Sequence, residues 1–165
     1  MREERVHFQE HKTILRSSIL IWFAGGAIGV MVSGKAGFAT AINCMDGRIQ
    51  IPVIEWMKKR CGVDYVDVIT EPGVDAILAE NKDAQTIERI KAKVNISIQK
   101  HHSKFIAVAG HHDCAGNPVD MQTHLAQIRS ATRTVASWGF KTQVLGLWIG
   151  EHWNVDNEIP QQTYD

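Results

Sequence analysis

Two short segments of the sequence concentrate side chains that could bind a metal ion. The first is NCMDGR at 43–48, and the second is GHHDCAG at 110–116. Thiolate sulfur and imidazole nitrogen are the ligands that Zn²⁺ prefers in proteins. Cys44, His111 and Cys114 can supply three such ligands, and the His-x-x-Cys spacing lets one loop present two of them. Because three protein ligands leave the fourth tetrahedral position for water, the pattern is typical of catalytic zinc rather than structural zinc.

Two charged residues follow the first cysteine closely enough to act beside a metal. Asp46 and Arg48 lie two and four positions beyond Cys44. A carboxylate there can accept a hydrogen bond from metal-bound water, and an arginine can hold that carboxylate in place. In the second segment His112 is an alternative to His111, but the two-residue gap to the next cysteine favours His111 as the ligand.

Both segments follow apolar runs that predict β-strands. Such runs occur at 37–43, 65–70, 104–110 and 142–149. Short apolar runs that end in polar or turn-forming residues are typical of buried strands. The first segment therefore begins where the first strand ends, and the second segment begins where the third strand ends.

A helix is predicted over 51–61, between the first two strands. Ile54, Met57 and Cys61 recur at helical spacing and share one face. Pro52 is suited to the first turn of this helix. We expect Cys61, on the apolar face, to be an inert buried thiol.

Two further helices are predicted from their capping residues. Asp83 can cap a long helix before the third strand, and the Asn117-Pro118 pair can begin the helix before the fourth. The polar tail after Gly150 is expected to be irregular.

The alternation of strands and helices predicts an α/β fold. Apolar strands joined by helices form a parallel β-sheet with helices on both faces. We predict the spatial strand order 2-1-3-4, which makes the first and third strands neighbours. Because ligands of such sheets bind beyond the carboxyl ends of the strands, this order brings the two segments together at one site.

Composition narrows the classes of protein further. The 165 residues suit one domain, which we place at 37–165. Lysine plus arginine and aspartate plus glutamate are each 18, so no net charge favours nucleic acid as a partner. Three cysteines cannot form a disulfide framework, and an odd number fits a reducing compartment, so we expect a cytoplasmic protein.

Residues 1–36 differ from the rest and are interpreted as an N-terminal extension. The segment 17–33 carries no charged side chain and contains three glycines. It falls just short of a typical membrane span. A dispensable or packed extension, a membrane anchor and a cleaved signal all stay open, so contact with a membrane, or export, depends on this segment alone.

The two segments resemble the signature motifs of one enzyme family. NCMDGR contains the Cys-x-Asp-x-Arg motif of the β-class carbonic anhydrases, and 110–116 is similar to their Gly-His-x-x-Cys-Gly-Gly segment. The order and separation of the motifs match over roughly 37–150. The resemblance implies Zn²⁺ on Cys44, His111 and Cys114, and a homodimer or a larger homo-oligomer.

Two positions depart from the pattern of that family. Thr70-Glu71-Pro72-Gly73 stands at the end of the second strand, where the family usually has Arg-Asn-Ala-Gly. Cys114 is followed by Ala115 rather than by the first of two glycines. The chain is therefore similar to a compact, divergent branch of the family.

The activity implied by the resemblance is zinc-dependent, reversible hydration of carbon dioxide to bicarbonate by a metal-bound hydroxide, a lyase reaction. Asp46 would orient the hydroxide, and Arg48 would keep Asp46 charged and in place. Alternatively, Asp46 occupies the fourth zinc position at rest and leaves it to pair with Arg48. Two other functions stay open: hydrolysis of carbonyl sulfide or carbon disulfide at the same zinc, and a non-catalytic zinc-binding domain, which the altered segment 70–73 would favour.

Overall fold

The computed structural model of the chain describes residues 37–159. The expectations for 1–36, including the apolar segment 17–33, therefore lie outside the described residues. Within the described part of the chain, no helix combines the length and the apolar character needed to cross a membrane. Between residues 37 and 159 the elements follow in this order: β1 Phe38–Asn43, α1 Gly47–Cys61, β2 Tyr65–Thr70, α2 Val74–Glu80, α3 Ala84–His101, β3 Phe105–His111, α4 Met121–Ala136, β4 Gln143–Ile149 and β5 Val155–Ile159.

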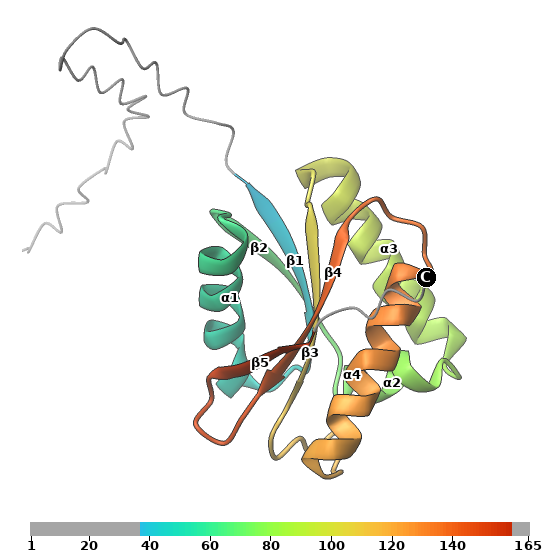
Figure 1. Ribbon diagram of the computed structural model, residues 1–165. Helices are drawn as coiled ribbons and strands as arrows, with labels where there is room; N and C mark the ends of the chain where they lie inside the picture. The colour runs from blue at the N-terminus through green and yellow to red at the C-terminus, as the bar shows by residue number, and fades with distance from the viewer. Residues whose placement is uncertain (1–36, 160–165) are drawn as a thin grey trace, which may run out of the picture. The chain divides into compact units, whose positions relative to one another are not determined.

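One sheet with the strand order β2-β1-β3-β4-β5 forms the centre of the fold (Figure 1). The first four strands are parallel, and β5 runs antiparallel to β4. The predicted parallel α/β sheet and its order 2-1-3-4 are confirmed. β1 and β3 lie side by side, so their carboxyl ends lie next to each other at the same edge of the sheet.

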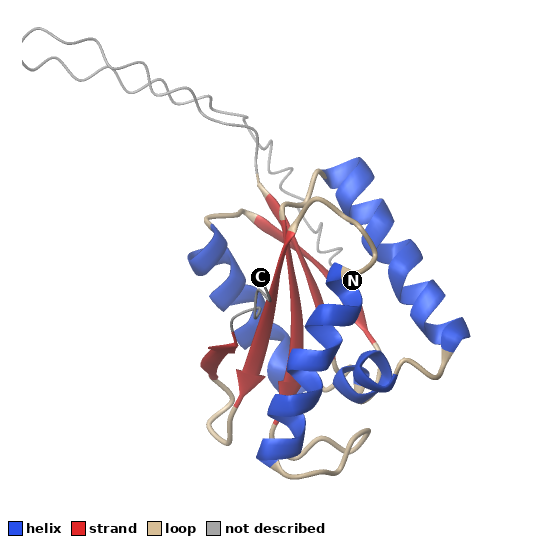
Figure 2. Cartoon of the chain, turned by 45° about the vertical axis from the view of Figure 1, so that its right-hand side comes forward, coloured by secondary structure: helices blue, strands red, loops and turns tan. Residues whose placement is uncertain are grey.

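Helices cover both faces of the sheet, as expected, but unequally. α1 packs on one face, and α2, α3 and α4 pack on the other (Figure 2). The alternation of side chains along β1 explains this division: Ala39 and Ala41 face α1, whereas Ile42 faces the helices of the other layer. The small side chains toward α1 are matched by bulky ones from the helix, since Ile49, Val53 and Met57 of α1 are fully or almost fully buried.

Two predicted helix starts are wrong. α1 begins at Gly47 rather than near 51, because the Asp46 side chain accepts a hydrogen bond from the backbone N–H of Arg48 and caps the helix. Pro52 therefore lies inside α1 rather than in its first turn. α4 begins at Met121, where Asp120 is the N-cap. Asn117, the predicted cap, and Pro118, the predicted first helical residue, belong to the loop before it. The predicted Asp83 cap of α3 is confirmed.

Two elements were not predicted. α2 has only seven residues and follows directly on Gly73, so its pattern is too short for helical periodicity to stand out. β5 lies in the tail that was expected to be irregular. It was missed because its sequence, VDNEI, is polar and buries only Ile159. An edge strand that faces solvent needs few apolar residues, and β5 is such a strand.

Candidate metal centre

The three predicted ligands come from adjacent strand ends. Cys44 is the first residue beyond β1, and His111 is the last residue of β3. Cys114 follows on the loop between β3 and α4. Because β1 and β3 are parallel neighbours, the two strands deliver these side chains to one edge of the sheet.

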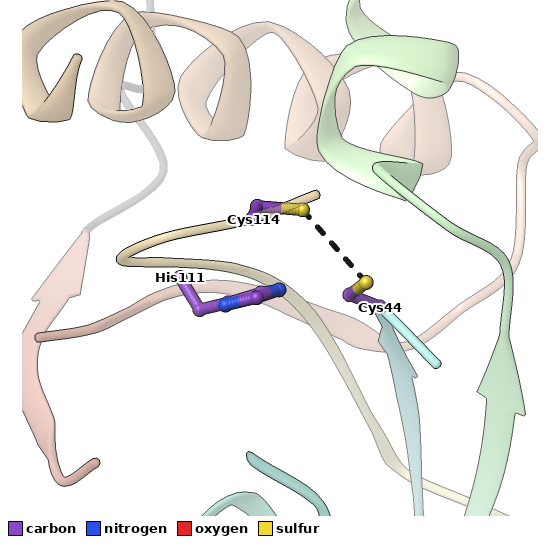
Figure 3. Close-up of side chains that lie close together, drawn as sticks. All are labelled: Cys44, His111 and Cys114. Carbon is purple, nitrogen blue, oxygen red and sulfur yellow. Dashed lines mark hydrogen bonds between the residues drawn. The ribbon is translucent and has the colours of Figure 1, made fainter. Parts of the chain in front are cut away.

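The side chains of Cys44, His111 and Cys114 lie together and are all buried (Figure 3). Their ligand atoms are within 4.8 Å of one another, and the two sulfur atoms are 3.8 Å apart. Two sulfurs bound at about 2.3 Å to one tetrahedral zinc would be separated by about 3.8 Å. The donor set and its spacing therefore fit a tetrahedral metal ion with three protein ligands.

The imidazole of His111 is oriented for a metal by its neighbour. Its Nδ1–H donates to the backbone carbonyl oxygen of His112 over 2.7 Å. The buried Nε2 makes no hydrogen bond within the described part of the chain. In metal-binding histidines, a hydrogen bond from the ring nitrogen that does not bind the metal fixes the tautomer and the position of the ring. The exposed His112 lies outside the group, so the geometry favours His111 over His112, as the spacing predicted.

The two thiols of the group differ in acidity. Burial opposes ionisation of Cys44, but the nearby imidazole of His111 and the backbone N–H groups of Gly73 and Asp46 lower its pKa to about 7. Burial and the charge of Cys44 raise the pKa of Cys114 to about 11. The Cys114 thiol donates to the Cys44 sulfur. Without a metal, Cys44 is the more acidic of the two thiols, and Cys114 is its hydrogen-bond donor.

Asp46 and Arg48 form a bidentate ion pair at the beginning of α1. Arg48 Nη2 lies 2.6 Å from Asp46 Oδ2, and Arg48 Nε lies 3.0 Å from Oδ1. The backbone N–H of Arg48 also donates to Oδ1, over 2.9 Å. The Arg48 guanidinium holds the pKa of Asp46 at about 2, although partial burial opposes this. Asp46 is therefore charged at every ordinary working pH, and the helix cap fixes its direction.

Arg48 has two further partners that the sequence did not reveal. Its Nη1 donates to Asp113 Oδ2 over 3.0 Å, and its guanidinium carbon lies 4.1 Å from the ring centroid of Trp153. Trp153 was missed because it lies in the tail expected to be irregular. Its only signal was one large aromatic residue among polar neighbours.

The segment that departs from the family motif packs directly against the candidate site. Gly73 has φ of 60°, and a Cβ placed on it would overlap the carbonyl oxygen of Gly116. Its backbone N–H is one of the groups that lower the pKa of the Cys44 thiol. The close approach of two backbones explains why glycine stands at both positions. The altered residues therefore still place one N–H donor at the cysteine.

A buried polar network anchors the loop that carries Cys114. The backbone N–H of Asn117 donates to the Cys114 carbonyl oxygen over 3.1 Å. The Asn117 amide also donates to the carboxylate of Asp75, which lies 2.5 Å from Nδ1 of His124. These side chains link α2, the loop and α4. Sequence reasoning missed Asp75 and His124, since neither belongs to a motif and their burial becomes evident only in the folded chain.

Cys61 takes no part in the group. It lies at the last position of α1, half-buried against the core beside that helix. Burial raises the pKa of its thiol. This agrees with the expectation of an inert thiol, although Cys61 is not fully buried.

Fold and site together define a class of protein: a parallel α/β domain with a buried Cys-His-Cys group at the carboxyl edge of its sheet and a carboxylate–arginine pair beside it. Residues 34–158 match the family described as "Putative carbonic anhydrase", and the chain belongs to that family. The family resemblance inferred from the two motifs is thereby confirmed.

Comparison with individual proteins adds distant relatives only. No curated protein matches the chain. A carbonic anhydrase from Glaciozyma antarctica has 14% identity and a TM-score of 0.43, and the match covers 73% of this chain and 81% of that one. A tetrameric β-carbonic anhydrase from Sordaria macrospora has 16% identity and a TM-score of 0.45, and the match covers 79% of this chain and 84% of that one.

Proposed function

We propose that this protein is a zinc-dependent carbonic anhydrase that hydrates carbon dioxide reversibly to bicarbonate. The observation that carries the proposal is the buried group of Cys44, His111 and Cys114, with sulfur atoms 3.8 Å apart, beside a charged Asp46. A purely structural zinc site uses four protein ligands and needs no such acid. The family to which the chain belongs supports the same reaction.

Zinc is the metal that best suits these donors. Two thiolates and one imidazole favour Zn²⁺ over the hard, oxygen-seeking cations Mg²⁺ and Ca²⁺. When bound, zinc supplies a Lewis acid that lowers the pKa of a coordinated water. In this proposal Cys44, His111 and Cys114 hold the ion, and binding removes the proton that Cys114 carries in the free protein.

Asp46 and Arg48 orient the reacting water. The Asp46 carboxylate is ionised and can accept a hydrogen bond from that water, which fixes the direction of its lone pair toward carbon dioxide. Arg48 donates hydrogen bonds to both carboxylate oxygens of Asp46, so it restrains Asp46 from turning onto the metal. The ion pair thus supports an open fourth position. The alternative in which Asp46 closes that position requires these hydrogen bonds to break.

A stopped-flow assay of carbon dioxide hydration, on protein whose zinc content has been measured, tests the proposal. We expect wild-type protein with one zinc per chain to accelerate hydration, and the zinc-depleted protein to regain activity on addition of Zn²⁺. Carbonyl sulfide and carbon disulfide are assayed in parallel, because a related hydrolase would use the same site. Zinc-loaded protein that is inactive toward all three gases would support the non-catalytic interpretation and overturn the proposal.

We propose further that the chain works as a homodimer or a larger homo-oligomer. Supporting this, β2 is an edge strand of the sheet and exposes Tyr65 by 53% and Val68 by 37%. Exposed apolar residues on an open strand favour pairing with another chain. Light scattering of wild type and of Val68→Asp tests this: the substitution is expected to lower the mass to that of one chain.

A cytoplasmic location completes the proposal. Cys44 and Cys114 are free thiols only 3.8 Å apart, and zinc binding requires both to stay reduced. Fractionation of cells that produce the full chain tests this, with recovery in the soluble cytoplasmic fraction as the expected result. Recovery with membranes would assign an anchoring role to 17–33.

A further inference from the structure

Arg48 is held by groups from three separate parts of the chain. Asp46 precedes it at the start of α1, Asp113 lies on the loop after β3, and Trp153 lies on the turn between β4 and β5. The Arg48 side chain is 43% exposed and that of Asp113 is 68% exposed, so their ion pair is well solvated. Exposed ion pairs fix a long side chain only weakly, because solvent screens them and side-chain entropy opposes them. The ring of Trp153 is the third partner.

The turn that carries Trp153 is itself well defined. The Trp153 N–H donates to the Gly150 carbonyl oxygen over 3.0 Å, and the Gly150 N–H donates to that of Asn154 over 3.2 Å. Trp153 has φ of 58°, a backbone conformation that a residue with a side chain seldom adopts. Such conformations persist only where the surroundings impose them, and they concentrate at functional sites.

Two contacts beyond the turn keep the indole in place. Trp153 is half-buried and packs against the core cluster that contains Cys44 and Cys114. β5, which follows the turn, is tied to α1 by Arg60, whose Nε and Nη2 donate to Glu158 over 2.8 and 3.0 Å. The hairpin thus presents a fixed aromatic face to Arg48. A guanidinium prefers to stack over such a face, and stacking fixes the plane of its five N–H donors.

We infer that Trp153 is a positioning residue for the reaction proposed above: its ring holds the plane of Arg48 so that the guanidinium stays on Asp46. This inference rests on the proposed function. Without the ring, Arg48 can rotate toward solvent with Asp113, and Asp46 loses the bidentate partner that restrains it. Displacement of an orienting group by about 1 Å can cost about 10²-fold in rate.

The first test measures hydration kinetics on zinc-loaded variants of the full chain. We expect Trp153→Leu to lower kcat by roughly 10- to 100-fold, with little change in KM and no loss of zinc. Trp153→Phe keeps an aromatic face and is expected to retain most of the rate. In an Arg48→Ala background, Trp153→Leu should add no further loss, because both substitutions then act on the same contact.

The matched control is Trp138→Leu. Trp138 is also partly buried, but it packs against the core cluster on the opposite face of the sheet. We expect its substitution to lower stability and to leave kcat unchanged. If Trp153→Phe is as slow as Trp153→Leu, or if the Trp153→Leu loss is the same with and without Arg48, the residue acts through packing alone and the inference is wrong.

The second test does not depend on activity. In a ¹⁵N spectrum of the full chain, the Nε–H of Arg48, assigned by comparison with Arg48→Ala, should be shifted upfield by the ring of Trp153 and protected from exchange by Asp46. Trp153→Leu should remove the shift and speed exchange. A wild type inactive toward every gas, with this signal behaving as expected, overturns the proposed function but keeps the contact. An active wild type whose Arg48 signal is unaffected by Trp153→Leu overturns the inference.

Discussion

The sulfur atoms of Cys44 and Cys114 lie 3.8 Å apart although 70 positions separate the two residues in the chain. Parallel pairing of β1 with β3 produces this approach, because it sets both carboxyl ends at one edge of the sheet. Nothing else within the described part of the chain groups three metal-binding side chains in this way.

Removal of either of these thiols should abolish metal binding. Cys44→Ser and Cys114→Ser each replace a soft anionic ligand with a neutral hydroxyl, and we expect zinc per chain to fall from near one toward zero. Cys61→Ser is the matched control, since Cys61 lies outside the group, and its zinc content should stay as in wild type. Elemental analysis of purified protein measures all three. Full zinc in Cys114→Ser would exclude Cys114 as a ligand.

Substitution of Asp46 should separate catalysis from metal binding. Asp46→Asn keeps the size but removes the charge that accepts a hydrogen bond, so zinc should remain while hydration falls about 10²- to 10⁴-fold. Because the pKa of Asp46 is about 2, its charge does not change between pH 6 and pH 9, and the loss should be the same factor throughout. Stopped-flow rates across that range check this. An Asp46→Asn variant with full zinc and full activity would show that the acid has no role.

Zinc affinity should rise with pH in two regimes. The pKa of Cys44 is about 7 and that of Cys114 about 11, and both must be deprotonated in the complex. Between pH 7.5 and 10 the Cys114 proton has to leave, so the logarithm of affinity should rise by at least about one per pH unit. Below pH 7 Cys44 is protonated too, and the slope should reach about two or more. Competition with a chelator, corrected for the chelator's own protonation, measures it; a flat profile above pH 7.5 would contradict a Cys114 thiol.

Gly73 should be far less tolerant of a side chain than Gly62. Both have φ near 60°, which costs an alanine roughly 1–2 kcal/mol in either place. A Cβ at Gly62 meets no atom within 4 Å, whereas one at Gly73 collides with the backbone of Gly116. We expect Gly62→Ala to lose only the conformational term, and Gly73→Ala to lose more stability and also zinc. Thermal unfolding and elemental analysis compare the two; equal losses would mean that the loops can separate freely.

A chain that begins at Met31 should still bind zinc. Every proposed ligand and every strand of the sheet lies between 37 and 159, so the metal group needs no residue before it. Zinc content and circular dichroism of the shortened chain, measured beside the full chain, check the proposed boundary between the extension and the domain. Loss of folding would assign 17–33 a packing role.

Local sequence patterns were enough to predict the elements of this fold that bury apolar side chains. The four parallel strands and the Asp83 cap were predictable because a run such as FIAVAGH, or an aspartate before a helix, is decided by its own residues. β5 was not predictable, because VDNEI is a strand only through its pairing with β4. α4 was placed too early because Asn117 and Pro118 imitate a helix start, while Asp120 makes the actual cap bond to Thr123.

The candidate site shows the same division. Cys44, Asp46, Arg48, His111 and Cys114 were predictable, since each belongs to a motif whose chemistry can be read from residue type and spacing. Trp153 and Gly73 reach the site only through tertiary structure. Trp153 lies on a hairpin that was not predicted, and Gly73 lies in a turn whose sequence departs from the family motif. Contacts between segments that are distant in the sequence have no local sequence pattern from which they could be predicted.

The order in which the chain is synthesised decides when its reactive sulfur appears. At about 5–20 residues per second, the 70 positions between Cys44 and Cys114 take about 4–14 s to translate. The groups that lower the pKa of Cys44 are the backbone N–H groups of Asp46 and Gly73 and the side chains of His111 and Cys114, which all follow it in the sequence. On the ribosome the Cys44 thiol therefore keeps the pKa of an ordinary cysteine and is poorly reactive toward oxidants and metals. Its pKa falls only when the loop that completes the site has folded beside it, so the most acidic sulfur of the centre forms in the same step as the structure that buries it.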